Sequence, residues 1–223
     1  MRGWVEVIAA LDTVFLPGLA VTCQISFLAL GLALCLGVVS GVASTAPWKP
    51  LRLLARSYVE FFQNTPLLLQ LFFLFYSLPY WGIRIDAFWA SVLSLGIYTG
   101  AYVSEVVRAG IGSVGRGQFD AGLAQGFGYG ALMRYIILPQ VRVVILPPLT
   151  NQCLNLVKNS AVAMIVGAGD LFYRTDNWQS QNFLTTPAYV TAALLYLSIT
   201  FPLSLLAVKL ERRTAWARWR APV

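Results

Sequence analysis

The segment FDAGLAQGFGYGALMRYIILP, residues 119–139, lies between long apolar stretches but is itself mixed in polarity. Three of its glycines, Gly126, Gly128 and Gly130, fall within five positions, and each costs a helix about 1 kcal/mol relative to alanine. The segment is therefore predicted to form a short helix over 119–125, a glycine bend, and a second short helix over 131–138. Proline at 139 is expected to end that second helix. This helical elbow should lie at the surface of a membrane, with one side packed against the protein and the other exposed to water.

The composition places the chain in a bilayer. Of its 223 residues, 58% are hydrophobic and 11% are charged, whereas a soluble globular domain has about a quarter of charged residues. The net charge of +7 does not indicate nucleic-acid binding, because no polar domain gathers the basic residues. The absence of histidine removes the commonest metal ligand and proton shuttle.

Five stretches meet or approach the length of about 20 mostly apolar residues that a membrane-spanning helix needs. No repeat and no soluble insertion interrupts them, so residues 1–223 are predicted to form one all-α integral membrane domain. The predicted spans are Thr13–Val42, Ser57–Tyr80, Phe88–Val107, Val143–Gly169 and Pro187–Val208. In the second span, Pro66 removes a backbone donor and favours a kink.

The distribution of lysine and arginine predicts the orientation of these spans, since cytoplasmic loops retain basic residues. Alternate connections are rich in them, which places the N-terminus outside, the C-terminus inside and the elbow in the cytoplasm. The polar segment 170–187 should then be an external loop. The basic residues behind this orientation are Lys49, Arg52 and Arg56; Arg108, Arg116, Arg134 and Arg142; and Lys209, Arg212, Arg213, Arg218 and Arg220.

Several motifs give the chain a resemblance to a known family. DAGLAQG followed by Tyr135 and ILP resembles the EAA loop of ABC importer permeases, whose pattern is Glu-Ala-Ala, three residues, Gly, and a hydrophobic stretch ending in Leu-Pro. The stretches YVEFFQNTPLLLQLFF (58–73), YTGAYVSEVVRAGIGSV (98–114) and LPPLTNQCLNLVKNSA (146–161) resemble the polar amino-acid branch of these permeases. The likeness runs in order from Tyr58 onward. Asp120, Gly122 and Gln63 depart from the family's usual Glu, Ala and basic residue.

The resemblance implies a permease subunit of a bacterial inner (plasma) membrane importer. Its partners would be a second permease subunit, identical or paralogous, two cytosolic ATP-binding subunits and an extracytoplasmic substrate-binding protein. The chain has no GxxxxGK[ST] phosphate loop, so ATP and magnesium would bind to the partner subunits, and this chain would hold no cofactor and perform no catalysis. The EAA-like loop, about 117–140, would form the coupling helix. The residues expected to couple to the ATPase are Asp120, Ala121, Gly122, Gln125, Gly126, Phe127 and Arg134.

Polar residues inside the predicted spans are candidates for contact with substrate. Asn151, Asn155, Lys158 and Asn159 share one face of the fourth span, and an intramembrane lysine normally faces a cavity or a partner. For the asparagines, hydrogen bonds between two permease subunits are favoured slightly over a pathway role. For Lys158 the pathway is favoured, because its ammonium could pair with an amino acid's carboxylate.

A second polar cluster starts the second span. Glu60 and Asn64 are further pathway candidates, although Glu60 could equally serve as a counter-ion for Arg56 or Arg108. Glu105 and Arg108, three positions apart, fit a structural ion pair.

Two other classes of protein remain as alternatives. A secondary transporter driven by an ion gradient would commonly need two related halves, which five spans do not provide. A membrane-embedded enzyme would need a catalytic constellation such as a Ser-His pair, which a chain without histidine lacks. The resemblance implies a polar amino acid as substrate and leaves glutamate, aspartate, glutamine and the basic amino acids open.

Overall fold

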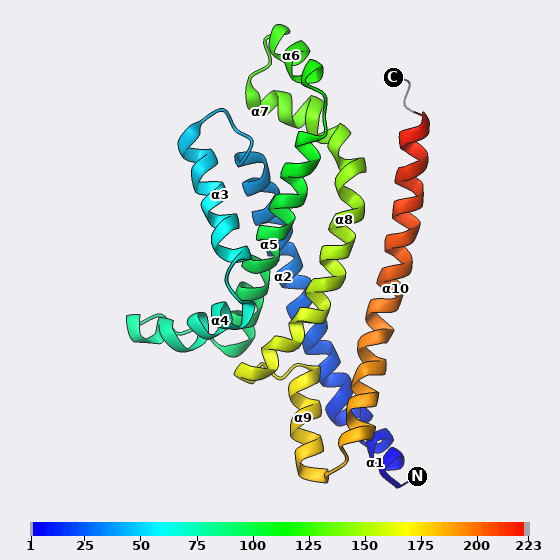
Figure 1. Cartoon of the computed structure of the whole chain (residues 1–223). Helices are drawn as coiled ribbons and strands as arrows, with labels where there is room; N and C mark the ends of the chain where they lie inside the picture. Colours follow the sequence, from blue (N-terminus) through cyan, green and yellow to red (C-terminus); the bar gives the residue numbers. More distant parts are fainter. Residues whose placement is uncertain (1, 221–223) are drawn as a thin grey trace. The chain divides into compact units, whose positions relative to one another are not determined.

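The computed structural model describes residues 2–220 for the backbone and 3–212 for the side chains, and over that part of the chain it contains helices joined by short turns, with no strand. Arg213, Arg218 and Arg220 of the basic C-terminal group therefore lie outside the described side chains. Figure 1 follows the helices in chain order. They are α1 (Arg2–Ala9), α2 (Leu16–Ala43), α3 (Lys49–Gln63), α4 (Leu67–Phe72), α5 (Ala87–Gly112), α6 (Arg116–Ala124), α7 (Tyr129–Leu132), α8 (Leu138–Asn159), α9 (Leu171–Asn182) and α10 (Thr185–Arg220).

Short segments of tighter or wider helix connect several of these elements. Three are π-helical turns and two are 3₁₀ helices. The π-helical turns are η1 (Leu11–Phe15), η2 (Phe73–Ser77) and η4 (Met133–Ile137), and the 3₁₀ helices are η3 (Leu78–Trp81) and η5 (Ser160–Val166).

Four of the described helical stretches are long and apolar enough to cross a membrane, and a fifth span arises if one broken pair is counted as a single span. Three of them contain the expected first, third and fifth spans with longer bounds, and the remaining one overlaps the expected fourth span but ends at Val166 instead of Gly169. The four stretches are Leu11–Ala43, Ala87–Gly112, Tyr129–Val166 and Thr185–Arg212.

The second predicted span, Ser57–Tyr80, is wrong as one continuous helix. The helix ends at Gln63 and a new one begins at Leu67, so the expected kink at Pro66 is a full break. Proline disfavours a helical conformation in the residue before it, which stops α3. The backbone amide and the side chain of Asn64 both donate to the Glu60 carbonyl, at 3.2 and 2.7 Å, at that helix end.

The contacts divide the chain into two compact units, which are described separately. Unit 1 comprises residues 1–31, 65–96 and 154–203. One of its apolar cores joins Val7 of α1 and Phe15 of η1 to Leu171 of α9 and Ala188 of α10. A smaller one joins α4, α5 and η5.

Helices α1 and α9 were not expected from the sequence. The external loop predicted over 170–187 is wrong for residues 171–182, which form α9. Asp170 starts this helix, because its Oδ2 atom accepts a hydrogen bond from the Phe172 amide at 3.0 Å. The buried Thr22 hydroxyl of α2 accepts the next free amide, that of Leu171, at 3.0 Å. Together they satisfy two of the backbone donors that a helix start leaves without partners.

Unit 2 comprises residues 32–64, 97–153 and 204–223. Its main core joins Val103, Val107 and Ile111 of α5 to Leu132, Ile137 and the start of α8. Helices α2 and α5 approach closely here because Gly37 and Gly41 face Val103 and Val107. A Cβ atom added at Gly37 would lie 2.3 Å from Val103 Cγ1. Small residues four apart allow this kind of close contact between membrane helices.

The elbow, residues 117–140, belongs wholly to unit 2 and contains the predicted first short helix and bend, followed by the start of a second, longer helix. Gly126 makes the bend with a φ of 82°, and α7 begins at Tyr129. The predicted stop at Pro139 is wrong, because the helical path continues from Tyr129 to Val166. Pro139 is the second residue of α8 and directly follows the π-helical turn η4, a wider turn that changes the carbonyl pairing where the proline lacks an N–H.

Candidate functional site

The predicted coupling residues lie on or beside α6, and most of them are exposed. Asp120, Ala121, Gln125, Gly126 and Arg134 are exposed, and Phe127 is half-buried against the main core of unit 2. Gly122 alone is buried, and it faces Leu132 so closely that an added Cβ would lie 2.3 Å from Leu132 Cδ1. One side of α6 is therefore seated on α7 while the other is free. The free side also carries Leu123, which is 56% exposed.

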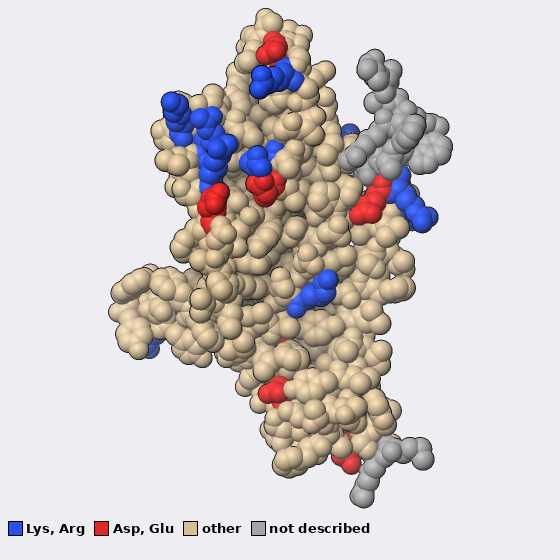
Figure 2. Space-filling model, viewed as in Figure 1, with Lys and Arg blue, Asp and Glu red and all other residues tan. Residues whose placement is uncertain are grey.

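Charged side chains gather in few places on the molecule. Figure 2 shows a face that is mostly uncharged, with a group of Lys and Arg atoms over α3. This helix carries Lys49, Arg52 and Arg56 at intervals of three and four residues, which places them on one side of it. Glu60 follows one turn after Arg56.

A cavity of about 400 Å³ lies in unit 2 between α3, α5 and the end of α2. Two acids and two arginines line it, together with three small polar side chains and one valine. The lining residues are Ser44, Arg56, Val59, Glu60, Gln63, Ser104, Glu105 and Arg108.

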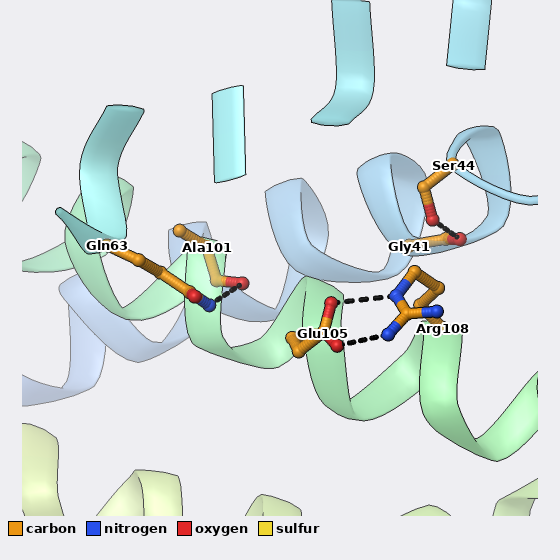
Figure 3. A network of polar contacts seen from close by, with 6 residues as sticks. All are labelled: Gly41, Ser44, Gln63, Ala101, Glu105 and Arg108. Atoms are coloured by element: carbon orange, nitrogen blue, oxygen red, sulfur yellow. Dashed lines mark hydrogen bonds and ion pairs between the residues drawn. The ribbon is translucent and has the colours of Figure 1, made fainter. Parts of the chain in front are cut away.

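Figure 3 shows how the polar groups of this cavity are held. The Arg108 guanidinium grips the Glu105 carboxylate with two nitrogens, Nε at 2.8 Å from Oε2 and Nη2 on Oε1, so the proposed structural ion pair is present. Gln63 donates from Nε2 to the Ala101 carbonyl of α5 at 3.1 Å. Where a basic residue is usual in the resembled family, this chain therefore ties α3 to the α5 backbone.

Three other groups that line the cavity, the side chains of Arg56, Glu60 and Ser104, lack an ion-pair or hydrogen-bond partner of this kind. Within the described side chains, the Arg56 guanidinium and the Glu60 carboxylate form no ion pair, so Glu60 is not the counter-ion of Arg56 or Arg108. The Ser104 hydroxyl is buried and lacks a hydrogen-bond partner among the described atoms. A buried hydroxyl without a partner is costly, so a small polar ligand would satisfy it.

The other predicted pathway residues are distributed between the two units. Lys158 is exposed in unit 1 and forms no ion pair with the described side chains. It lines a mostly apolar groove of about 440 Å³ with Phe172, Tyr189, Tyr196 and Thr200. Asn155 and Asn159 belong to the same unit, and Asn155 is exposed. Asn151 is exposed in unit 2, and Asn64 caps α3 outside the cavity lining.

Asp170 is a buried acid that the sequence argument did not single out. Its side chain is fully buried in unit 1, and its Oδ1 atom has no hydrogen-bond partner among the described atoms. Burial raises the pKa of this carboxyl from 3.8 to about 6, against the opposing effect of the amides that bond it. Asp170 follows Gly167 and Gly169 in a predicted loop, and nothing in that local sequence predicts that its carboxyl is buried.

Asp170→Asn is expected to stabilise the protein at pH 7. The folded protein binds this proton more tightly than the unfolded chain, so Asp170 lowers the free energy of unfolding as pH rises from about 4 to 6 and costs about 1–3 kcal/mol above that range. Asparagine keeps the oxygen that caps α9 and removes the charge. Thermal unfolding in detergent at pH 7 and pH 5 checks this: the variant's advantage should shrink at pH 5. A variant that melts below the parent at pH 7 would contradict the cost assigned to the buried charge.

Comparison with known proteins gives this arrangement a family. Residues 33–216 match the family described as "Binding-protein-dependent transport system inner membrane component". The chain belongs to this permease family. The permease is 42% identical over 201 residues to a protein of Bacillus subtilis described as a probable glutamine ABC transporter permease, covering 90% of this chain and 93% of that one. It is 34% identical to the arginine transport system permease of the same organism over 199 residues, 89% and 91% of the two chains.

Solved structures agree with the sequence relatives. The permease superposes on a chain from the crystal structure of an amino acid ABC transporter with histidines with a TM-score of 0.83 and 35% identity, covering 93% of this chain and 97% of that one. A chain of the MetNI methionine ABC transporter in an inward-facing conformation gives 0.74 at 17% identity, covering 90% and 96%, which shows a shared fold. The permease is thus a multi-pass inner membrane subunit of an amino-acid ABC transporter.

Proposed function

We propose that this permease forms half of the translocation pathway of a polar amino-acid importer and receives the work of ATP hydrolysis through its elbow. The observation that carries the coupling role is the one-sided packing of α6, which lies on α7 at Gly122 and is exposed at Asp120, Ala121, Leu123 and Gln125. A helix held on one side and bare on the other suits docking to a partner protein. In this proposal the elbow lies in the cytoplasm, and two ATP-binding subunits hold the ATP and magnesium.

The energetic demand on such a contact is moderate. A partner shifts a two-state equilibrium only by binding the two states differently, and moving it from 1:99 to 99:1 takes about 5.5 kcal/mol. Exposed Leu123, Ala121 and the half-buried Phe127 offer apolar area, and Asp120 and Arg134 offer charge. A few such contacts suffice for that difference.

The cavity of unit 2 supports an amino acid as the transported solute. Every amino acid carries a carboxylate and an ammonium, and the cavity offers Arg56 and Glu60 without ion-pair partners, beside the unsatisfied Ser104 hydroxyl. Lys158 offers a further cation for a carboxylate in unit 1. Asn151, Asn155, Asn159 and Asn64 stay as pathway candidates, with hydrogen bonds to the second permease subunit as the alternative for the first three.

The substrate is proposed to be glutamine, glutamate, aspartate or a basic amino acid. The relatives described as glutamine and arginine permeases support this range. A second permease subunit and an extracytoplasmic substrate-binding protein complete the assembly in this proposal.

Purification in mild detergent followed by reconstitution tests the proposal. We expect an ATP-binding subunit to co-purify and the vesicles to accumulate radiolabelled polar amino acid only with ATP and binding protein present. Gradient-driven uptake by the permease alone would instead support a secondary transporter and overturn the proposal.

A further inference from the structure

One side chain of the elbow, that of Tyr129, forms hydrogen bonds with the end of α2 and the turn after it. The Tyr129 hydroxyl donates to the Val42 carbonyl at 2.9 Å and lies 2.8 Å from the Thr45 hydroxyl. Thr45 Oγ1 is itself 2.9 Å from the same carbonyl, so three oxygens lie in a triangle in which the two hydroxyl protons make two hydrogen bonds at a time. Among the described residues, no other side-chain hydrogen bond joins residues 117–140 to α2 or to the turn after it.

The local sequence explains why the acceptor is available. Helix α2 ends at Ala43, and the last four carbonyls of a helix have no partner within it. The Thr45 amide reaches the Val42 carbonyl at 3.1 Å, which leaves its second lone pair for a hydroxyl. Tyr129 is the first residue of α7, and its half-buried ring packs on the main core of unit 2, so the hydroxyl is held in place.

The same end of α2 borders the cavity. Ser44, which lies between the two residues that Tyr129 contacts, lines that cavity and bonds to the Gly41 carbonyl at 2.7 Å. The end of α2 thus lies between α7 and the cavity, joined to α7 by these hydrogen bonds and to the elbow's core by the packing of Val42. The elbow's other side-chain bonds, from Gln140 to Gln118 and to the Ile136 carbonyl, stay within the elbow.

We propose that Tyr129 is a positioning residue that transmits movement of the elbow to the end of α2 and so to the cavity. This inference rests on the proposed coupling role of the elbow. A chain of contacts becomes evidence of transmission only when breaking it changes the coupling between the two ends.

Tyr129→Phe tests the inference, because it keeps the ring and removes only the hydroxyl. The measurement is uptake per ATP hydrolysed by the complete transporter in vesicles. Loss of a hydrogen bond should lower this ratio about three- to tenfold. Thr45→Val leaves the Tyr129 bond to Val42 in place and should lower the ratio less, and the double variant should be no worse than Tyr129→Phe alone, because Thr45 acts through the Tyr129 hydroxyl.

Tyr80→Phe is the matched control, since Tyr80 lies outside the elbow, is 89% exposed and donates no hydrogen bond within the described side chains. Its ratio should equal that of the parent. A merely structural role for Tyr129 would lower the melting temperature or the amount of co-purified ATPase subunit in step with the ratio. Both should stay unchanged in Tyr129→Phe.

Two results would overturn the inference: an unchanged ratio in Tyr129→Phe, or a ratio that falls only together with assembly. The bulky elbow variant Gly126→Trp separates this failure from failure of the proposed function. If that variant loses coupling while Tyr129→Phe keeps it, the elbow couples by another route. If both keep it, the coupling role of the elbow itself fails.

Discussion

Replacing Gly126 by tryptophan is expected to leave the permease inserted in the membrane and to reduce ATP-driven uptake at least tenfold. Gly126 has a φ of 82°, where a residue with a side chain is strained by about 1–2 kcal/mol. It is also exposed at the edge of the proposed docking side, where an indole would hold the partner away. ATP hydrolysis should persist without stimulation by substrate, because the ATP-binding subunits no longer contact the permease productively.

A pair of alanine variants separates the backbone effect from bulk. Neither Gly126 nor Gly128 has an atom within 4 Å of an added Cβ, but Gly128 has a φ of −69°, which any residue adopts. Gly126→Ala should therefore weaken coupling several-fold and Gly128→Ala should not. Uptake and hydrolysis in reconstituted vesicles provide both measurements. Normal substrate-stimulated hydrolysis and uptake in Gly126→Trp would count against docking at the elbow.

Removing the charge of Lys158 is expected to raise the substrate concentration needed for half-maximal uptake about 10- to 100-fold. A hydrogen bond to a charged group contributes about 1.5–3 kcal/mol. Lys158 forms no ion pair with a described acid, so its ammonium is available to a substrate carboxylate. Lys158→Met keeps the length and apolar stem of the side chain. Lys158→Arg restores the charge and should recover most of the affinity.

The alternative role of Lys158, binding the second permease subunit, gives a different result. Lys158→Met would then reduce the amount of paired permease on size-exclusion chromatography, and the affinity of assembled transporters would not change. An unchanged concentration dependence in intact complexes would remove Lys158 from the pathway.

Hydropathy was enough to predict most of the helical spans, because a bilayer imposes helices of about fixed length on apolar sequence. The elbow followed from glycine spacing, and the Gly126 bend was confirmed. The predicted stop at Pro139 was wrong because the π-helical turn η4, directly before the proline, changes the carbonyl pairing there and the helix continues. No local sequence pattern predicts such a turn.

Contacts between distant segments could not be predicted in the same way. The sequence placed Glu105 one turn from Arg108, and a pair on one helix is a local matter. It could not show that Gln63 bonds to Ala101, that Ser104 is buried without a partner, or that Tyr129 reaches Val42 across 87 positions. These depend on which helices pack together, and that is decided by close approach at positions such as Gly37.

The contact between Gly122 and Leu132 limits which residues can be combined at these two positions of the elbow. A methyl group at 122 would require the Cδ1 atom of Leu132, which is 1% exposed, to move, so alanine at the first position needs a smaller or displaced side chain at the second. Chimeras that exchange coupling segments between importers should therefore be cut outside residues 117–140, so that both halves of the contact travel on the same graft.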